Sequence, residues 1–249
     1  LLDLPVPFTM SVLPGLSYSR RFALAATELA LPPTGDAAPG AVAVAAEAAR
    51  RRREAATPVT LGLGAAPGRL ETRRREVMLH LPMESVRYPD IDPGPGAVLV
   101  GMDRDAIADR VDRALAALPH VRGVNNHQGS AATAHRPTME ALMDVLRARD
   151  LFFLDSLTSS RSVAYETALA AGLPAARNRI FLDDDHRNRE KIRERLATLV
   201  RSARASGAAV GIGHPHPGTL EVLRAEVPRL AAEEVRCVTI SELLALAAE

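Results

Sequence analysis

The segment 123–130, GVNNHQGS, constrains the fold more than any other part of this chain. Two Asn and a His follow a short apolar run directly, and a Gly comes almost at once after them. Polar side chains with strong ligand chemistry are unusual at the end of an otherwise buried strand. The same pattern recurs at four other places, where β-like runs end in His80, Asp155-Ser156, Asp183 and His214-Pro215-His216. Several parallel strands that end in such residues are typical of an α/β barrel with an active site at one rim.

Alternating strand-like and helix-like patterns predict an α/β fold of about seven strands. Most strands are separated by helices, which favours a mostly parallel sheet. A barrel is favoured over a doubly wound sheet, because the latter would concentrate functional residues near one switch point. The strands are expected at 6–14, 76–81, 121–125, 151–155, 180–183, 208–213 and 235–239.

Helix boundaries carry their own local signals. Asp103 and Thr239 are suited to N-cap positions, and Thr239 forms a capping-box pattern with Glu242. Gly172 and Gly207 follow apolar-periodic segments, as expected of residues that end helices. The predicted helices begin near Asp103, Pro137, Ser162, Asn188, Thr219 and Thr239.

The chain is expected to form a single domain over 1–249 with an insertion at 23–72. That stretch has low complexity and is rich in Ala, Pro, Gly and Arg. We expect a partly disordered surface loop, although 41–56 can form a helix carrying the Arg50–Arg53 run. A basic interaction arm is the alternative.

Charge and composition exclude several classes of protein. Lys and Arg number 31 against 30 Asp and Glu, so there is no electrostatic case for nucleic acid or an anionic membrane. No apolar run reaches the length of an integral membrane segment. A lone Cys permits no intramolecular disulfide, and no segment resembles a signal peptide. The chain reads as mid-domain from Leu1, which predicts further sequence upstream.

His80 is the first candidate metal ligand. It ends an apolar run and directly precedes Leu81-Pro82. Imidazole is a suitable ligand for Zn²⁺. Glu84 follows four residues later, as a second ligand or as a carboxylate that orients the first. A partly buried structural His is the alternative.

His127 is the second candidate ligand. Asn125 and Asn126 can fix its tautomer or hydrogen-bond a polar ligand such as a sugar, and Ser130 can cap the next turn. The alternative is an Asn-rich turn whose side chains bond only their own backbone.

The remaining strand ends offer acids and bases. Asp155-Ser156 is either catalytic or the anchor of the following loop, and no Gly-x-Ser-x-Gly elbow supports a serine nucleophile. Asp183 precedes a helix, whose dipole alone can account for a carboxylate there. Period-two spacing directs His214 and His216 to opposite sides, and we expect His214 to face the site. Together the candidates predict a mononuclear metal hydrolase.

These segments in this order resemble the divergent polysaccharide deacetylase family, a bacterial branch related to deacetylases of chitin and peptidoglycan. The motifs are EVMLHLPME, GVNNHQGS, FLDS, FLD and IGHPHP followed by Thr219-Leu220. The match covers Leu4–Arg20 and Arg75 to the end of the sequence. The resemblance implies a deformed (β/α) barrel, a divalent metal (usually Zn²⁺), a glycan substrate and a periplasmic or secreted setting.

The resemblance also implies roles for single residues. His80 matches the first metal-binding His of the family's His-x-x-x-His motif, Glu84 stands at the second, and His127 restores an imidazole. His214 matches the general acid and Asp155 the carboxylate that orients it. Substrate contacts are expected from Asn125, Asn126, Ser130 and Ser156.

The chain departs from the family pattern at its start. The family opens with a strand ending in Asp-Asp, and this sequence begins after that point, so we expect the first strand to be missing. The sequence therefore favours a metal-dependent carbohydrate deacetylase-like hydrolase. The alternatives are a catalytically degenerate glycan-binding or envelope scaffold on the same barrel and, less favoured, a metal-dependent phosphoesterase.

Overall fold

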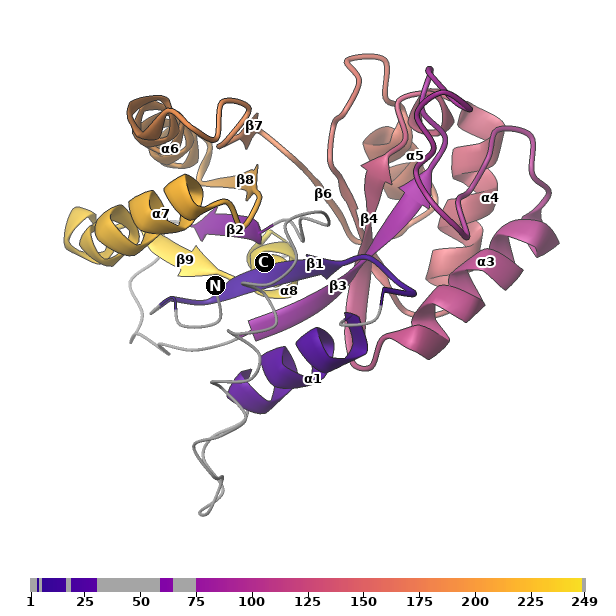
Figure 1. Cartoon of the computed structure of the whole chain (residues 1–249), viewed down its shortest axis with the longest axis horizontal. Helices are drawn as coiled ribbons and strands as arrows, with labels where there is room; N and C mark the ends of the chain where they lie inside the picture. Colours follow the sequence, from indigo (N-terminus) through magenta and orange to yellow (C-terminus); the bar gives the residue numbers. More distant parts are fainter. Residues whose placement is uncertain (1–3, 5, 17–18, 31–58, 65–74, 248–249) are drawn as a thin grey trace. The chain divides into compact units, whose positions relative to one another are not determined.

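A computed structural model describes residues 4, 6–16, 19–30, 59–64 and 75–247 of the chain (Figure 1). Nine strands and seven α-helices are formed by these residues, which confirms the predicted α/β class. The chain divides into two compact units. Unit 1 comprises Leu1–Met10, Arg21–Val77 and Asn178–Glu249, and unit 2 comprises Ser11–Arg20 and Met78–Arg177.

Unit 2 is built on parallel strands in the order β6-β5-β4-β3. They are β3 (Arg75–Met83, from Met78 onward), β4 (Val121–Gln128), β5 (Phe152–Asp155) and β6 (Ala175–Arg177). The register of β4 on β5 aligns Asn125 with Leu154, and β5 on β6 aligns Asp155 with Arg177. Because β4 and β5 pair in parallel and share one carboxyl end, the polar residues near the ends of these two strands lie along one edge.

Three helices accompany these strands: α3 (Arg104–Ala117), α4 (Arg136–Arg147) and α5 (Ala164–Ala170). Asp103 caps α3 as predicted, accepting a hydrogen bond from the Ala106 amide at 2.8 Å. The N-cap of α4 is His135, an unusual cap, whose Nδ1 accepts from the Thr138 amide. The buried side of α3 is formed by Ile107, Val111 and Ala114, whereas α5 begins at Val163 without a side-chain cap.

Gly123 is the small residue that allows β4 to pass close to β5. A Cβ at this position would lie 2.2 Å from the ring of Phe152. At the other end of the segment, Gly129 has φ +86°, a left-handed conformation that ends the strand directly after Gln128. Gly123 thus permits the close approach of β4 to β5, and Gly129 ends β4.

Unit 1 contains the antiparallel part of the fold. Strand β2 (Val59–Gly64) pairs antiparallel with β1 (Phe8–Val12), β8 (Ala208–Gly213) and β9 (Arg236–Val238). Strand β7 (Ile180–Phe181) pairs parallel with β8. The helices of unit 1 are α1 (Ser19–Ala30, from Arg21 onward), α6 (Arg189–Ser206), α7 (Pro217–Leu230) and α8 (Ile240–Leu246). Short 3₁₀ turns lie at Ala231–Glu233 in unit 1 and at Ala132–Ala134 in unit 2.

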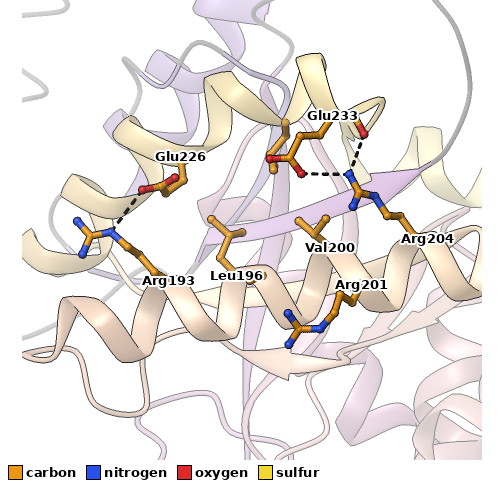
Figure 2. Close-up of a pocket in the computed structure, with 9 residues that line it drawn as sticks. Arg193, Leu196, Val200, Arg201, Arg204, Glu226 and Glu233 are labelled. Atoms are coloured by element: carbon orange, nitrogen blue, oxygen red, sulfur yellow. Dashed lines mark hydrogen bonds and ion pairs between the residues drawn. The ribbon is translucent and has the colours of Figure 1, made fainter.

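Helix α6 packs on β8 with an apolar stripe that includes Ile192, Leu196 and Leu199. Asn188 caps its start, and Gly207 ends it at φ +81°. The predicted capping box of Thr239 and Glu242 begins α8. Between α6 and α7 lies a groove of about 320 Å³, floored by Leu196, Val200 and Leu230 (Figure 2). Charged residues that line the groove form salt bridges, Arg193 with Glu226 and Arg204 with Glu233.

Three parts of the predicted fold are wrong. Strands β2 and β6 were not predicted, since β2 lies in the low-complexity stretch and β6 has only three residues. The ends of the predicted insertion at 23–72 belong to α1 and β2, and its middle, including 41–56 and Arg50–Arg53, lies outside the described residues. No pairing among the described strands closes either set into a ring, so the predicted barrel closure is not present in them.

Candidate active site with two histidine clusters

The first cluster is an imidazole pair in unit 2. His80 projects from β3 and is 6% exposed, whereas His127 on β4 is half-buried. Nε2 of His80 lies 3.1 Å from Nδ1 of His127, and the two rings meet edge to face. The two predicted imidazole ligands, 47 residues apart in the sequence, are therefore adjacent in the structure.

Asn125 determines which nitrogen of His80 carries the proton. The Asn125 Oδ1 accepts from Ser11 Oγ at 2.9 Å, while its Nδ2 donates to Ser156 Oγ at 3.0 Å. The same Oδ1 lies 2.9 Å from Nδ1 of His80, so that nitrogen carries the proton and donates. Nε2 of His80 is left as the basic nitrogen that faces His127. Asn125 thus orients His80, whereas the sequence had suggested His127.

Asn126 and Ser156 bind one another instead of projecting outward. The Ser156 amide donates to Asn126 Oδ1 at 2.8 Å, and Ser156 Oγ donates to the Asn126 carbonyl at 2.9 Å. Asn126 Nδ2 donates to the Gln128 carbonyl at 2.8 Å. Both side chains are almost fully buried, so they join β4 to β5, and the expected substrate contacts are not seen in this geometry.

Glu84 and Ser130 fix the loop after β3. Glu84 Oε2 accepts from the Val100 amide at 2.8 Å, and Ser130 Oγ accepts from the Val86 amide at 3.0 Å. Within the described chain Glu84 belongs to no group of three or more potential metal ligands. The predicted ligand role of Glu84 is therefore replaced by a loop-holding one, and Ser130 is likewise occupied by backbone.

The imidazole pair suits part of a zinc site. With Zn–N bonds of 2.0–2.1 Å, two corners of a tetrahedron are separated by about 3.3 Å, close to the observed 3.1 Å. Fixing the outer nitrogen of His80 with an amide oxygen is a common arrangement for a metal-binding His. A catalytic zinc ion usually takes three protein ligands, and the described residues around this pair supply two.

Asp155 anchors the loop that follows β5. Its Oδ1 accepts from the Leu157 amide at 2.8 Å and its Oδ2 from Ser162 Oγ at 2.7 Å. Burial raises the pKa of Asp155, against the effect of these hydrogen bonds. The sequence left this anchoring function open, and the contacts support it.

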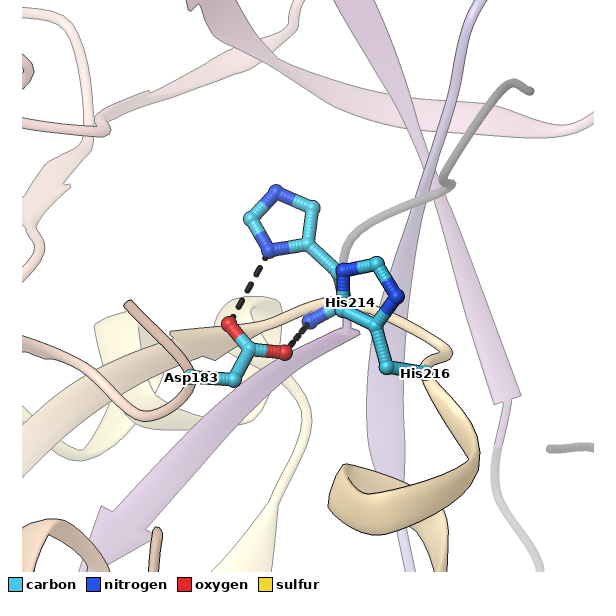
Figure 3. A group of neighbouring side chains, drawn as sticks. All are labelled: Asp183, His214 and His216. Carbon is cyan, nitrogen blue, oxygen red and sulfur yellow. Dashed lines mark hydrogen bonds and ion pairs between the residues drawn. The ribbon is translucent and has the colours of Figure 1, made fainter. Parts of the chain in front are cut away.

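The second cluster lies in unit 1, where Asp183 meets His214 (Figure 3). His214 Nδ1 is 3.0 Å from Asp183 Oδ1, and the His214 amide donates to Asp183 Oδ2. Thr219 Oγ1 also donates to Oδ2 at 2.9 Å. The carboxylate that orients His214 is thus Asp183, and the assignment of this role to Asp155 is wrong.

The charge state of this pair follows from its contacts. Burial by itself raises the pKa of Asp183, but the hydrogen bonds and charge of His214 outweigh burial and hold the pKa below its usual value. The carboxylate side chain is 1% exposed, whereas that of His214 is 34% exposed. An ionised, buried Asp183 therefore holds Nδ1–H of His214, and Nε2 of His214 is the nitrogen available for proton exchange.

His216 lies beside this pair, with its ring centroid 5.9 Å from that of His214, and stacks on His186 with ring centroids 4.1 Å apart. Burial and the neighbouring His186 lower the pKa of His216. Ligand atoms of Asp183, His214 and His216 lie within 4.8 Å of one another. Asp183 Oδ2 accepts from the His214 amide and from Thr219, and Oδ1 faces Nδ1 of His214, so the same contacts suit an Asp–His proton-transfer pair.

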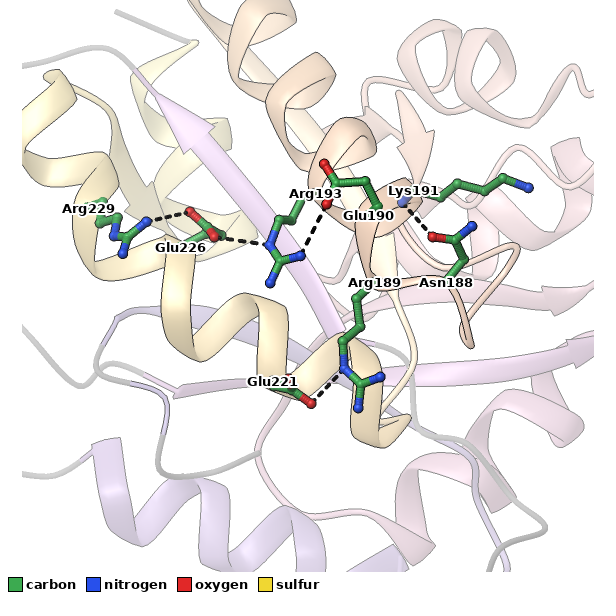
Figure 4. Close-up of polar contacts among 8 residues, drawn as sticks. All are labelled: Asn188, Arg189, Glu190, Lys191, Arg193, Glu221, Glu226 and Arg229. Atoms are coloured by element: carbon green, nitrogen blue, oxygen red, sulfur yellow. Dashed lines mark hydrogen bonds and ion pairs between the residues drawn. The ribbon is translucent and has the colours of Figure 1, made fainter.

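Ion pairs join the helices that follow the two halves of this cluster (Figure 4). Helix α6 begins shortly after Asp183, and α7 begins directly after His216. Arg189 on α6 contacts Glu221 on α7 at 2.7 Å, and Arg193 contacts Glu226 at 3.3 Å. Exposed pairs of this kind stabilise weakly one by one, so their value here is to fix one helix start against the other.

Comparison with known proteins identifies the family. The model for divergent polysaccharide deacetylases matches residues 55–244, and the chain belongs to this family, as the sequence predicted. An uncharacterized protein of Haemophilus influenzae is 35% identical over 173 residues, which cover 70% of this chain and 60% of that protein. The uncharacterized protein YibQ of Escherichia coli is 32% identical over 169 residues, 68% of this chain and 52% of YibQ. The chain thus spans between half and two thirds of these relatives.

The fold is shared with a solved structure. The uncharacterized protein ATU2773 from Agrobacterium tumefaciens C58 superposes with a TM-score of 0.68 at 22% identity. The match covers 96% of this chain and 89% of ATU2773, which supports the fold alone. In the described part of the chain, no helix has the length and apolar character needed to cross a membrane.

Proposed function

We propose that the protein is a metal-dependent, deacetylase-like hydrolase that removes an acetyl group, held as amide or ester, from a polysaccharide of the bacterial envelope. The observation that carries the proposal is the His80–His127 pair, with the His80 tautomer fixed by Asn125. Family membership supports the reaction class and the glycan substrate. A periplasmic or secreted setting is part of the same proposal.

His80 and His127 would hold the metal, for which we propose Zn²⁺. When bound, Zn²⁺ lowers the pKa of a coordinated water and polarises a carbonyl oxygen. Asn125 contributes by keeping the proton of His80 on Nδ1, away from the His127 side. Ser11 and Ser156 hold the Asn125 amide in that orientation.

His214 is proposed as the general acid. Asp183 holds Nδ1–H of His214 and stabilises the imidazolium, so that Nε2 can carry the proton that the departing amine or alkoxide requires. Thr219 and the His214 amide keep the carboxylate of Asp183 in place. Metal binding is thus proposed for the His80–His127 pair of unit 2 and, as a separate proposal, proton transfer for the Asp183–His214 pair of unit 1.

Bound metal and acetate release test the proposal. The protein, at the full length of its gene, is assayed for zinc by mass spectrometry and for acetate with acetylated glycans. We expect about one zinc ion per chain and acetate release that chelation abolishes. An intact protein that binds no divalent metal and releases no acetate would overturn the proposal.

A catalytically degenerate glycan-binding or envelope scaffold is the second candidate. It is favoured by Glu84, whose carboxylate accepts from the Val100 amide, and by a cluster with only two imidazole ligands among the described residues. A scaffold would bind saccharide equally well after His80→Ala and His127→Ala. The hydrolase would lose its metal in both variants.

A further inference from the structure

The loop 84–101, which follows β3, concentrates exposed apolar side chains. Eight large apolar residues of the described chain are exposed, and four of them are in this loop: Val86, Tyr88, Ile91 and Val100. Val86 is 60% exposed and Tyr88 41%. In a chain with no Trp and three Tyr, an aromatic ring placed in solvent calls for an explanation.

This loop is held in one conformation by its own hydrogen bonds. The Tyr88 amide donates to the Ser85 carbonyl at 3.0 Å, and the Ile91 amide donates to the Arg87 carbonyl at 2.9 Å. Glu84 closes its base through the Val100 amide. The exposed apolar side chains are thus presented by a preorganised turn, which lowers the ordering cost of binding.

The loop is attached to both strands of the imidazole pair. It leaves β3 at Met83, three residues after His80. The Val86 amide donates to Ser130 Oγ, three residues after His127 on the segment that leaves β4. The apolar side chains therefore belong to the same end of unit 2 as the two imidazoles.

Charged side chains alternate with the apolar ones. Arg87, Asp90 and Asp92 are exposed between and beside Val86, Tyr88 and Ile91. A lipid or an apolar protein surface would have to desolvate these charges. A pyranose ring offers a C–H face to an aromatic ring and hydroxyls to carboxylates and guanidinium, so it satisfies both kinds of group.

We propose that Tyr88, with Val86 and Ile91, forms a binding platform for a sugar unit of an extended glycan, beyond the unit that carries the acetyl group. This inference rests on the glycan substrate proposed above and deepens it. It means that the protein acts on chains of several sugars and binds short fragments poorly.

The test compares Tyr88→Ala with two controls, Tyr88→Phe and Leu169→Ala. Leu169 is 50% exposed on α5 and serves as an apolar truncation elsewhere in unit 2. Probes are N-acetylglucosamine oligomers of two and six units, with affinity measured by calorimetry, and 4-nitrophenyl acetate as a small ester. We expect Tyr88→Ala to weaken hexamer binding about three- to tenfold and to leave dimer binding and ester hydrolysis unchanged. Both controls should match the wild type.

Several outcomes would overturn the platform. They are hexamer affinity equal in wild type and Tyr88→Ala, no hexamer binding by the wild type, or self-association that Tyr88→Ala abolishes in place of a glycan effect. A wild type that binds hexamer through Tyr88 and releases no acetate would contradict the hydrolase and leave the platform standing. Acetate release by the wild type, with hexamer binding unchanged in Tyr88→Ala, would contradict the platform and leave the hydrolase standing.

Discussion

The two histidine clusters differ in the group that holds the outer nitrogen of the key imidazole. His80 is held by the neutral amide of Asn125, and His214 by the ionised carboxylate of Asp183. The neutral amide accepts a hydrogen bond from Nδ1 of His80 without adding charge, an arrangement that is common for a metal-binding His. A carboxylate stabilises the imidazolium, as a general acid requires. In the proposed function, these partners suit His80 to metal binding and His214 to proton transfer.

The largest expected effect separates metal binding from proton transfer. His80→Ala and His127→Ala each remove one of two imidazole ligands, so zinc content should fall below a tenth of the wild-type value and acetate release should disappear. His214→Ala should retain its zinc. Metal analysis of the three purified variants decides the matter, and zinc loss in His214→Ala would contradict the division of roles.

The second prediction concerns Asp183, the carboxylate of the cluster in unit 1. Asp183→Asn keeps the shape but no longer stabilises the imidazolium, so kcat should fall about 10²–10⁴-fold with zinc unchanged. Its matched control is Asp155→Asn, a buried carboxylate in a loop anchor, which should lower thermal stability and change kcat much less. Steady-state kinetics with an acetylated glycan measures both. Equal kcat losses in the two variants would contradict the assignment of Asp183 to His214.

Removing the neutral partner should give a smaller effect. Asn125→Ala releases Nδ1 of His80 and leaves Ser11 and Ser156 without their shared partner. Zinc affinity should drop about 10–100-fold, and stability should fall by about 1–3 kcal/mol. Competition with a chelator and denaturant unfolding measure the two effects. Unchanged affinity would show that the tautomer of His80 is set elsewhere.

The smallest effect concerns His216. Its pKa in the folded protein is lowered from 6.5 by burial and by His186, so the unfolded chain binds this proton more readily. The stability that neutral His216 contributes is present above pH 6.5 and is lost as the pH falls through the lowered folded-state pKa. His216→Gln should therefore flatten the acid side of the Tm profile, by an amount on the order of one degree. A profile that remains parallel to the wild type down to pH 5 would contradict this.

Local signals predicted the regular parts of the fold well. Asp103, Asn188 and the Thr239 capping box stand where helices begin, because a cap is a contact between residues three apart. Strand β2 was not predicted, because it is defined by partners that are 144 to 176 residues away in the sequence, on β8 and β9.

In the candidate site, too, the sequence did not reveal contacts between residues that are far apart in the chain. Strand ends pointed to His80, His127, Asp155, Asp183 and His214, and the structure places two close pairs among them. The sequence could not state that Asp183, and not Asp155, bonds His214, since both carboxylates follow apolar strands in the same way. Glu84 was misassigned for a related reason, because its partner is a backbone amide without a side-chain signature.

The sequence boundaries of the two units have a further consequence. The chain passes from one unit to the other four times, after Met10, Arg20, Val77 and Arg177. Neither unit corresponds to one uninterrupted stretch of gene, although the key residues of each cluster do: His80 and His127 lie within Met78–Arg177, and Asp183 and His214 lie within Asn178–Glu249. A single protease cut within strand β3, for example between Val77 and Met78, would separate no complete unit from the rest. Each cluster is therefore encoded by one continuous segment, whereas the unit around it is assembled from separate ones.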